Sequence, residues 1–230
     1  LGGAMRKRNI YVLMLTVFLL LMSACSKEDE KKQTSTSESN EENVVLNTYP
    51  FTGIETEDEV DQRAYAVMVN NHKAARPQSG LSQADIIFEL LTESNITRFL
   101  AIYQSTPPEV VGPVRSAREY FFTRAEGYDA IYVYQGEAKS VDMIQSRGIE
   151  NLPGSRYDND GHLFVRESFR KAPHNSYFQF GAANEVAEER GYETTANYEP
   201  LLFLEEGEEV IGEEAPHVKI NYLLSSPVVE

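Results

Sequence analysis

Residues 64–69 read Ala-Tyr-Ala-Val-Met-Val, and the polar pair Asn70-Asn71 follows directly. An apolar run of this length with a polar end predicts a β-strand inside a core. Two further runs, residues 85–92 and 96–104, are rich in strand-forming residues and are separated only by Glu93-Ser94-Asn95. This spacing predicts a β-hairpin that follows the first strand.

Helix signals alternate with strand signals in the rest of the chain. Ser116 followed by Glu119 predicts a capping box at a helix start, and Gly127 is the expected end of that helix. We expect a buried strand at residues 130–134, helices at residues 138–147 and 182–190 ended by Gly148 and Gly191, and late strands at residues 201–204 and 218–224. This alternation predicts an α/β fold, with a mixed sheet flanked by helices in an α/β sandwich.

The N-terminal segment has the pattern of an export signal. Met5 is followed by a basic cluster, and residues 10–22 are almost wholly apolar. This stretch is shorter than the ~20 residues of a membrane-spanning helix. Small residues then precede Cys25, which is the one cysteine of the chain. We expect residues 1–4 to be extraneous leader, residues 5–24 to be a lipoprotein signal peptide, and Cys25 to carry the lipid. The alternative is an ordinary signal peptide or a membrane anchor with an incidental cysteine.

The segment after the cysteine has the composition of a spacer. Residues 26–43 contain no apolar side chain, so they cannot offset the entropy cost of ordering. We expect residues 25–43 to be a disordered tether that leaves the protein extracytoplasmic and lipid-anchored to the cell membrane. An α/β domain is expected over residues 44–205. We expect residues 206–230 to start a second, C-terminal domain that is truncated, because no closing element follows the last strand.

The charge of the chain excludes one class of partner. The formal net charge is −15, whereas domains that bind nucleic acid carry basic surfaces. The acidic excess lies in residues 55–61 and 185–214, which we expect to be solvated faces. We therefore expect no nucleic-acid partner.

The first candidate site is the segment 112–118, Gly-Pro-Val-Arg-Ser-Ala-Arg. A helix N-terminus attracts anions, and guanidinium groups bind phosphate or carboxylate with paired donors. We therefore expect Arg115, Ser116 and Arg118 to bind an anionic ligand. The alternative is a plain capped helix whose arginines pair with carboxylates such as Asp85 or Glu89.

The second candidate site is the polar loop of residues 70–81, which leaves the C-terminal end of the first strand. Ligands of α/β proteins bind beyond such strand ends. We expect Arg76, Gln78 and Ser79 to contribute to binding, together with Arg98 of the hairpin. The alternative is a surface loop with ordinary turn chemistry.

Two residues are candidate catalytic groups. His174 could act as a general acid or base, because the pKa of a histidine lies near neutrality; the alternative is a histidine that hydrogen-bonds its loop. Asp85 could orient an arginine or hold a metal ion. No P-loop, zinc spacing or glycine-rich dinucleotide turn is present, and the run Asp-Asn-Asp-Gly at residues 158–161 lacks the further ligands of a calcium loop. We expect no metal and no cofactor, except Mg²⁺ if the chain is an enzyme.

Several motifs resemble those of the YerB-type lipoproteins. They are the N-terminal lipoprotein signal that ends at Cys25 and residues 75–81, 83–86, 96–99 and 112–118. The resemblance spans essentially all of the chain after the tether. It implies a bacterial family of unknown function, typical of Gram-positive cells, with a second, smaller C-terminal domain beyond residue 230. The family supplies no established catalytic residues.

The order of the elements is also similar to that of the LytR-CpsA-Psr enzymes. That resemblance implies transfer of glycopolymers from a polyprenyl pyrophosphate to the cell wall, with arginines on the pyrophosphate and a magnesium ion. Asp85 and Arg115 would match the Asp and Arg of those motifs. Ser116 stands where an acidic residue should follow the Arg, a departure that weakens the implied metal binding and catalysis.

These inferences give one main hypothesis and two rivals. The main one is an envelope lipoprotein that binds an anionic ligand, such as a phosphorylated glycopolymer or lipid intermediate, through an arginine cluster at a helix N-terminus. One rival is a phosphotransferase acting on polyprenyl-phosphate-linked glycopolymer. The other is a non-catalytic protein-interaction module with structural arginines. We expect Arg76, Arg115, Arg118 and His174 to converge on one open cavity if the main hypothesis holds.

Overall fold

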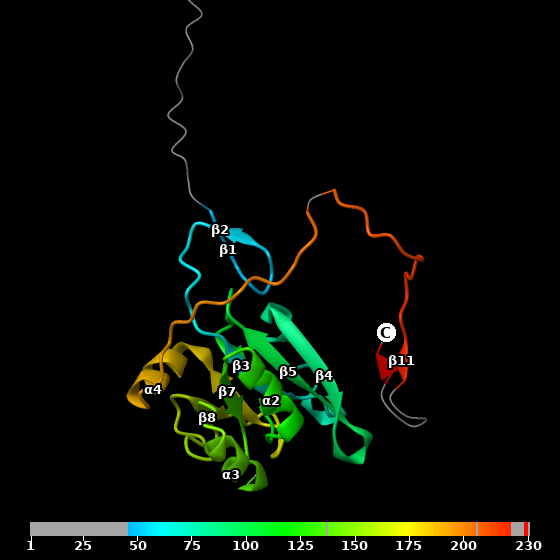
Figure 1. The fold of residues 1–230 in the computed structure, drawn as a ribbon. Helices are drawn as coiled ribbons and strands as arrows, with labels where there is room; N and C mark the ends of the chain where they lie inside the picture. The colour runs from blue at the N-terminus through cyan, green and yellow to red at the C-terminus, as the bar shows by residue number, and fades with distance from the viewer. Residues whose placement is uncertain (1–45, 137, 206, 222–227, 230) are drawn as a thin grey trace, which may run out of the picture. The chain divides into compact units, whose positions relative to one another are not determined.

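The computed structural model describes residues 46–136, 138–205, 207–221 and 228–229 (Figure 1). The predicted signal peptide, Cys25 and the tether lie outside these residues. Within the described part of the chain, no helix has the length and apolarity needed to span a membrane.

The centre of the fold is a five-stranded mixed sheet (Figure 1). Its strands, in order across the sheet, are β4 (Ile86–Leu91), β5 (Thr97–Tyr103), β3 (Tyr65–Asn70), β7 (Ile131–Tyr134) and β8 (Asn151–Pro153). β3 is antiparallel to β5 and parallel to β7, and β7 is parallel to β8. The short 3-10 helix η3 (Glu93–Asn95) joins β4 to β5 as the predicted hairpin requires. The predicted α/β fold with a mixed sheet is confirmed.

The central strand β3 is buried along its whole length. Its side chains alternate between the two faces, because successive residues of a strand point to opposite sides. Tyr65, Val67 and Val69 belong to one core cluster, while Ala66 and Met68 belong to another. An unbroken apolar run is therefore what a strand with a core on each face requires.

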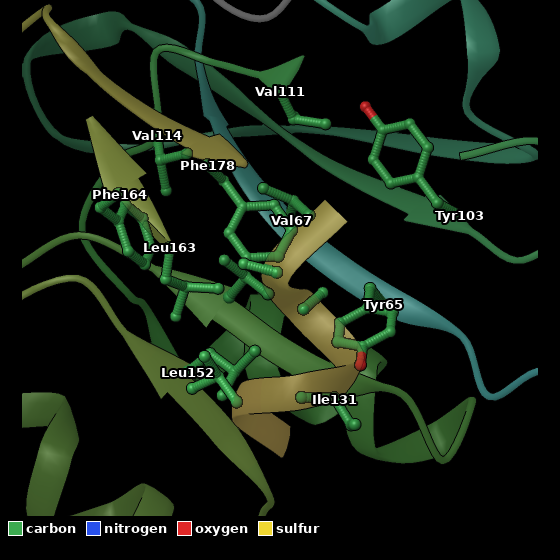
Figure 2. Close-up of a cluster of buried hydrophobic side chains, with 14 of the residues drawn as sticks. Tyr65, Val67, Tyr103, Val111, Val114, Ile131, Leu152, Leu163, Phe164 and Phe178 are labelled. Carbon is green, nitrogen blue, oxygen red and sulfur yellow. The ribbon is translucent and has the colours of Figure 1, made fainter. Parts of the chain in front are cut away.

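One face of the sheet is covered by a smaller sheet and a helix. These elements are β6 (Val110–Val111), β10 (Ser176–Gln179), β9 (Phe164–Arg166) and α4 (Ala183–Glu189). Figure 2 shows Phe164 and Phe178 of the smaller sheet beside Val67 and Leu152 of the main sheet, and all four are fully buried.

The other face is covered by helices. They are α2 (Glu119–Gly127) and α3 (Ala138–Ser146). Phe121 and Phe122 of α2 and Ile144 of α3 are fully buried in the cluster that contains Met68 of β3. With α2 and α3 on one face and α4 on the other, helices flank the sheet as predicted.

The remaining elements are short. They are β1 (Asn47–Thr48), β2 (Glu55–Thr56), η1 (Lys73–Ala75), η2 (Leu81–Gln83), η4 (Phe180–Ala182), β11 (Ile220–Asn221) and β12 (Val228–Val229). β1 pairs with β2, and β11 with β12. Of the late strand predicted at residues 218–224, the structure describes β11, and residues 222–224 lie outside the described part.

The strand predicted at residues 201–204 is wrong. This apolar run forms no strand. Leu201 N donates a backbone hydrogen bond to the carbonyl of Pro50, at 2.8 Å. An apolar run needs a neighbouring strand to become part of a sheet, and the described residues offer it none.

The predicted capping box at Ser116 is also wrong. The residue that caps α2 is Arg118, which has extended backbone angles and makes no side-chain cap bond. The preceding segment is held extended by the main sheet, because Arg115 N donates to the carbonyl of Met68 at 2.9 Å and the Arg115 carbonyl accepts from Gln135 N at 2.9 Å. The helix therefore starts two residues after the predicted N-cap would place it.

The glycine stop signals differ in outcome. Gly148 and Gly191 follow α3 and α4 with φ of 67° and 77°, as predicted for residues that end a helix in the left-handed region. Gly127 is instead the last residue of α2. The left-handed residue after that helix is Asp129, with φ of 45°.

Strand β8 forms one edge of the main sheet. Pro153, its last residue, has no N–H to donate. The outward carbonyl of Asn151 accepts a hydrogen bond from the Tyr192 hydroxyl at 3.4 Å, and that of Pro153 accepts from Arg156 N at 2.9 Å. The backbone of this edge is thus largely occupied within the chain.

Residues after α4 return to the N-terminal part of the domain. The Tyr198 hydroxyl accepts a hydrogen bond from the backbone N–H of Ala64 at 2.9 Å, and Ala64 is fully buried. The ring of Tyr198 lies 4.8 Å from that of Phe51 between centroids. The proposed domain boundary at residue 205 stays a prediction.

Candidate functional site

A cavity of about 190 Å³ lies at the C-terminal end of β3. Its lining residues are Asn70, His72, Thr92, Glu93, Ile96, Arg98, Arg115 and His174. They come from the end of β3, the loop after it, the tip of the β4–β5 hairpin, the segment after β6, and the loop between β9 and β10. Three of the predicted site residues, Arg98, Arg115 and His174, meet here.

Strand pairing brings most of these residues together. Asn70 at the end of β3 lies directly across from Arg98 at the start of β5. The hairpin tip follows at once, so Glu93 is placed beside them. On the other side, Asn70 N donates to the carbonyl of Pro113 at 2.9 Å, which holds Arg115 next to the same strand end.

Arg170 joins the His174 loop to the loop after β3. Its guanidinium donates to the carbonyls of Ala75 and Pro77, each at 2.6 Å, and to the Tyr177 hydroxyl at 2.9 Å. Hydrogen bonds from a charged donor are stronger than neutral ones. The two loops that carry the histidines are therefore fixed to each other.

The amide of Asn70 is oriented by the backbone. Its Oδ1 accepts from His72 N at 3.0 Å, so its Nδ2 is the group that faces His174 Nδ1 at 2.8 Å. An amide nitrogen can only donate. His174 Nδ1 is therefore an acceptor, and the neutral ring carries its proton on Nε2.

His72 has the same tautomer for a similar reason. Its Nδ1 accepts from Ala74 N at 3.0 Å, which leaves the proton of the neutral ring on Nε2. The rings of His72 and His174 are stacked, with centroids 4.7 Å apart and planes at 14°. Two parallel imidazoles thus line the cavity with an N–H donor each.

The arginines of the site differ in how they are paired. Arg118 makes two bonds to the Glu93 carboxylate, at 2.6 and 2.9 Å, from outside the cavity lining. Arg98 is 8% exposed, donates to the Ser116 carbonyl at 2.9 Å and lies 3.9 Å from Glu93. Arg115 is half-buried, and among the described residues its guanidinium has no ion-pair or hydrogen-bond partner.

The pKa values around the cavity reflect this crowding of positive charge. The hydrogen bond from Arg118 lowers the pKa of Glu93 to about 2. Burial, and then the nearby charges of Arg118 and Arg115, lower the pKa of Arg98 to about 10. Burial and then Arg118 also lower the pKa of Arg115. Burial, followed by His72, Arg115 and Arg170, lowers the pKa of His174. The cavity therefore favours negative charge.

The predicted residues of the loop after β3 lie outside the cavity lining. The guanidinium of the exposed Arg76 donates to the carbonyl and side chain of Asn71, at 3.2 and 3.0 Å. The Gln78 amide donates to the carbonyl of Asn70 and to Asn71 Oδ1. Ser79 pairs through its backbone with Gly112. Of Arg76, Arg115, Arg118 and His174, which were expected to converge on one cavity, only Arg115 and His174 line it.

Asp85 lies at the other end of the β4–β5 hairpin. Its carboxylate accepts from the backbone N–H groups of Gln104 and Ser105 and from the Ser105 hydroxyl. It therefore organises that turn and contacts none of the site arginines. Ser116 contributes its carbonyl to Arg98.

No metal site is evident in the part of the chain that the structure describes. No group of three or more His, Cys, Asp or Glu side chains there could hold an ion. In the run at residues 158–161, Asp160 Oδ1 accepts from the backbone N–H groups of His162, Leu163 and Phe164. This run is a turn stabilised by its own side chain.

Sequence reasoning missed five residues of the cavity lining: Asn70, His72, Thr92, Glu93 and Ile96. Asn70 and His72 were inside the loop that the strand end singled out, but a lone histidine carries no pattern of its own. Glu93 was assigned only to the hairpin turn. It comes near Arg98 because the turn that contains it begins directly after the last pair of the hairpin, Leu91 and Thr97.

The comparison with protein families decides the family of this chain. Residues 51–193 match the model described as "Protein of unknown function (DUF3048) N-terminal domain". The chain belongs to the DUF3048 family. The match contains every residue of the cavity lining.

Relatives of this DUF3048 protein agree with that assignment. It is 46% identical over 175 residues to YerB of Bacillus subtilis (strain 168), whose name presents it as a candidate lipoprotein; the match covers 75% of this chain and 52% of YerB. The chain thus spans about half the length of this curated relative. A crystal structure of YerB from Bacillus subtilis matches with a TM-score of 0.65 and 48% sequence identity, over 69% of this chain and 55% of that one. The predicted YerB-type family is confirmed.

Proposed function

We propose that this protein is a cell-envelope lipoprotein whose α/β domain binds an anionic ligand in the cavity at the end of β3. The signal-peptide pattern that ends at Cys25 and the name of the YerB relative support the lipid anchor. The ligand carries a phosphate or carboxylate group, as phosphorylated envelope glycopolymers and lipid intermediates do. Arg115 and Arg98 are the binding groups, and His72 and His174 supply further donors.

One observation carries this proposal. The Arg115 guanidinium lines the cavity, half-buried, without a partner among the described residues. Structural arginines in this chain are paired: Arg63 contacts Asp129 and Glu150, and Arg147 contacts Glu126. Burying a charge without a partner costs free energy, and a bound anion would offset that cost.

The location of the site differs from the one expected from sequence. The cavity lining contains no residue of the first turn of α2. The proposed ligand therefore contacts side chains at the end of a strand, where ligands of open α/β sheets bind. The anion-binding chemistry is retained, and the free amide groups of the helix end have no part in it.

Substitution of Arg115 tests the proposal. We expect Arg115→Ala to weaken binding of inorganic phosphate or malonate at least about tenfold in calorimetric titration, because a charge-assisted hydrogen bond contributes about 1.5–3 kcal/mol. Arg156→Ala is the matched control, since Arg156 is exposed, stacks on Tyr157 and is absent from the cavity lining. If neither anion binds the unaltered chain, or if both variants bind equally, the arginine is structural and the interaction-module alternative gains.

A further inference from the structure

We propose that the cavity selects a doubly charged tetrahedral oxyanion, such as a terminal phosphoryl group, over a carboxylate, and that its binding places a proton on His174. This inference rests on the proposed function. It adds the class of ligand and a dependence on pH.

The charge count favours a dianion. Arg98 and Arg115 line the cavity, and Glu93, which lines it too, is already paired with Arg118 outside the lining. Glu93 is ionised near neutral pH, because its pKa is lowered to about 2. With the charge of Glu93 matched by Arg118, the two guanidinium groups of the lining present a charge of about +2 to a ligand. A phosphoryl dianion neutralises this charge, whereas a single carboxylate leaves half of it unbalanced.

The hydrogen-bond donors of the cavity also outnumber the two acceptor oxygens of a carboxylate. A carboxylate presents two oxygens, and a terminal phosphoryl or sulfate group presents three or more. The stacked imidazoles offer one Nε2–H each, at two levels of the stack, as fixed by the bonds at Nδ1 from Asn70 and Ala74. Arg115, which lines the same cavity from a separate segment, adds a planar fork of donors. A tetrahedral group can accept from these directions together.

His174 is the group whose protonation responds to the ligand. The charged and titratable groups that face it are His72 of the neighbouring loop, Arg115 and Arg170, with Arg98 and Glu93 across the cavity. Burial and the cations lower the pKa of His174 in the empty cavity, so the ring is neutral near pH 7. An adjacent dianion opposes the effect of the cations and raises that pKa. Binding then takes up a proton, and affinity rises as the pH falls below the ordinary histidine range.

Sulfate is the probe that isolates this effect, because it stays doubly charged where phosphate itself titrates. By calorimetry of the purified chain, we expect sulfate to bind about tenfold more tightly at about pH 5.5 than at about pH 7.5, which corresponds to a shift of about one pKa unit on binding. Repeating the titration in buffers of different ionisation enthalpy should show uptake of up to about half a proton at a pH between the free and bound pKa values of His174, the maximum for a shift of this size. At about pH 7.5, sulfate and phosphate should bind more tightly than acetate.

The matched variants are His174→Gln and His162→Gln. His162 is exposed and pairs with Glu185 away from the cavity. We expect His162→Gln to keep the pH dependence of sulfate binding and His174→Gln to lose most of it. If His174→Gln does not fold, ¹⁵N NMR of the imidazoles in the unaltered chain takes its place: His174 should be the Nε2–H tautomer when free and doubly protonated with sulfate.

The outcomes separate the two proposals. Sulfate binding that is equal at both pH values, that takes up no proton, or that is matched by acetate would overturn this inference and leave anion binding intact. If sulfate, phosphate and acetate all fail to bind at any pH, both this inference and the proposed anion binding are overturned. A proton taken up equally by His174→Gln would assign it to another group and contradict the role of His174.

Discussion

At the scale of single residues, Glu93 controls how much positive charge the cavity presents. It pairs with Arg118 and lies near Arg98, so it competes with any anionic ligand for the same cations. Its own carboxylate is 60% exposed, and solvent therefore limits what the pair contributes to folding. The competition with a ligand is the more measurable consequence.

We expect Glu93→Gln to tighten sulfate binding about threefold to tenfold, because one negative charge leaves the site. Glu126→Gln is the control: it also breaks an arginine pair, that with Arg147, at the other end of α2. Calorimetric titration of both variants measures the difference. Weaker binding in Glu93→Gln would mean that Glu93 positions the arginines and that its charge does not compete.

Glu93 also makes the stability of the fold depend slightly on pH, in the direction of lower stability in acid. The pKa of Glu93 is lowered in the folded chain to about 2. Its stabilisation is therefore complete above the ordinary carboxyl range and is lost as the pH falls from there toward about 2. Because the carboxylate is exposed, we expect its contribution to be less than about 1 kcal/mol. In denaturant unfolding, the loss of unfolding free energy between neutral and acidic pH should therefore be smaller in Glu93→Gln by no more than that amount. A larger effect would indicate a buried role that the geometry does not suggest.

At the scale of elements, the glycine that ends α2 and the glycine that follows α3 give a matched pair. Gly148 has φ of 67°, whereas Gly127 lies inside α2 without a left-handed φ, and a Cβ at either position would meet no atom within 4 Å. We expect Gly148→Ala to destabilise the fold by about 1 kcal/mol through backbone strain. Gly127→Ala should stabilise it by about 0.5 kcal/mol through helix propensity. Thermal unfolding of the two variants checks the opposite signs; a loss in both would place Gly127 outside the helix.

Elements were predictable from the sequence where local pattern and tertiary pairing agree. The runs that became β3, β4, β5 and β7 carry both an apolar pattern and a partner strand. The start of α2 was not predictable, because Arg115 is bonded to β3 through contacts distant in sequence. The run at 201–204 shows the converse: an apolar pattern with no strand to pair with among the described residues.

At the scale of the whole molecule, the cavity combines segments that are far apart in the chain. Arg98, Arg115 and His174 could each be chosen from sequence by charge or titration range. Their convergence depends on sheet register and on the Arg170 contacts between two loops, which no local motif encodes. For the same reason Arg76, from the correct loop, could not be excluded before the structure placed its guanidinium on Asn71.

The return of the chain at Tyr198 predicts where a stable domain ends. The family match stops at residue 193, before the hydroxyl that pairs with the buried N–H of Ala64. We expect Tyr198→Phe to lower the free energy of unfolding by about 1–3 kcal/mol, the cost of leaving that N–H without a partner. Tyr49→Phe is the control, because its hydroxyl has no hydrogen bond among the described residues. Equal stability of the two variants in urea would show that water replaces the bond.

The closed edge at β8 has a consequence for a protein held at a surface. A lipid anchor confines molecules to two dimensions, where neighbours meet often and unpaired strands invite one sheet to join another. Here the proline that lacks a donor, and the tyrosine that occupies the Asn151 carbonyl, leave an approaching strand little to bond. We therefore expect this side of the sheet to resist pairing between neighbouring copies.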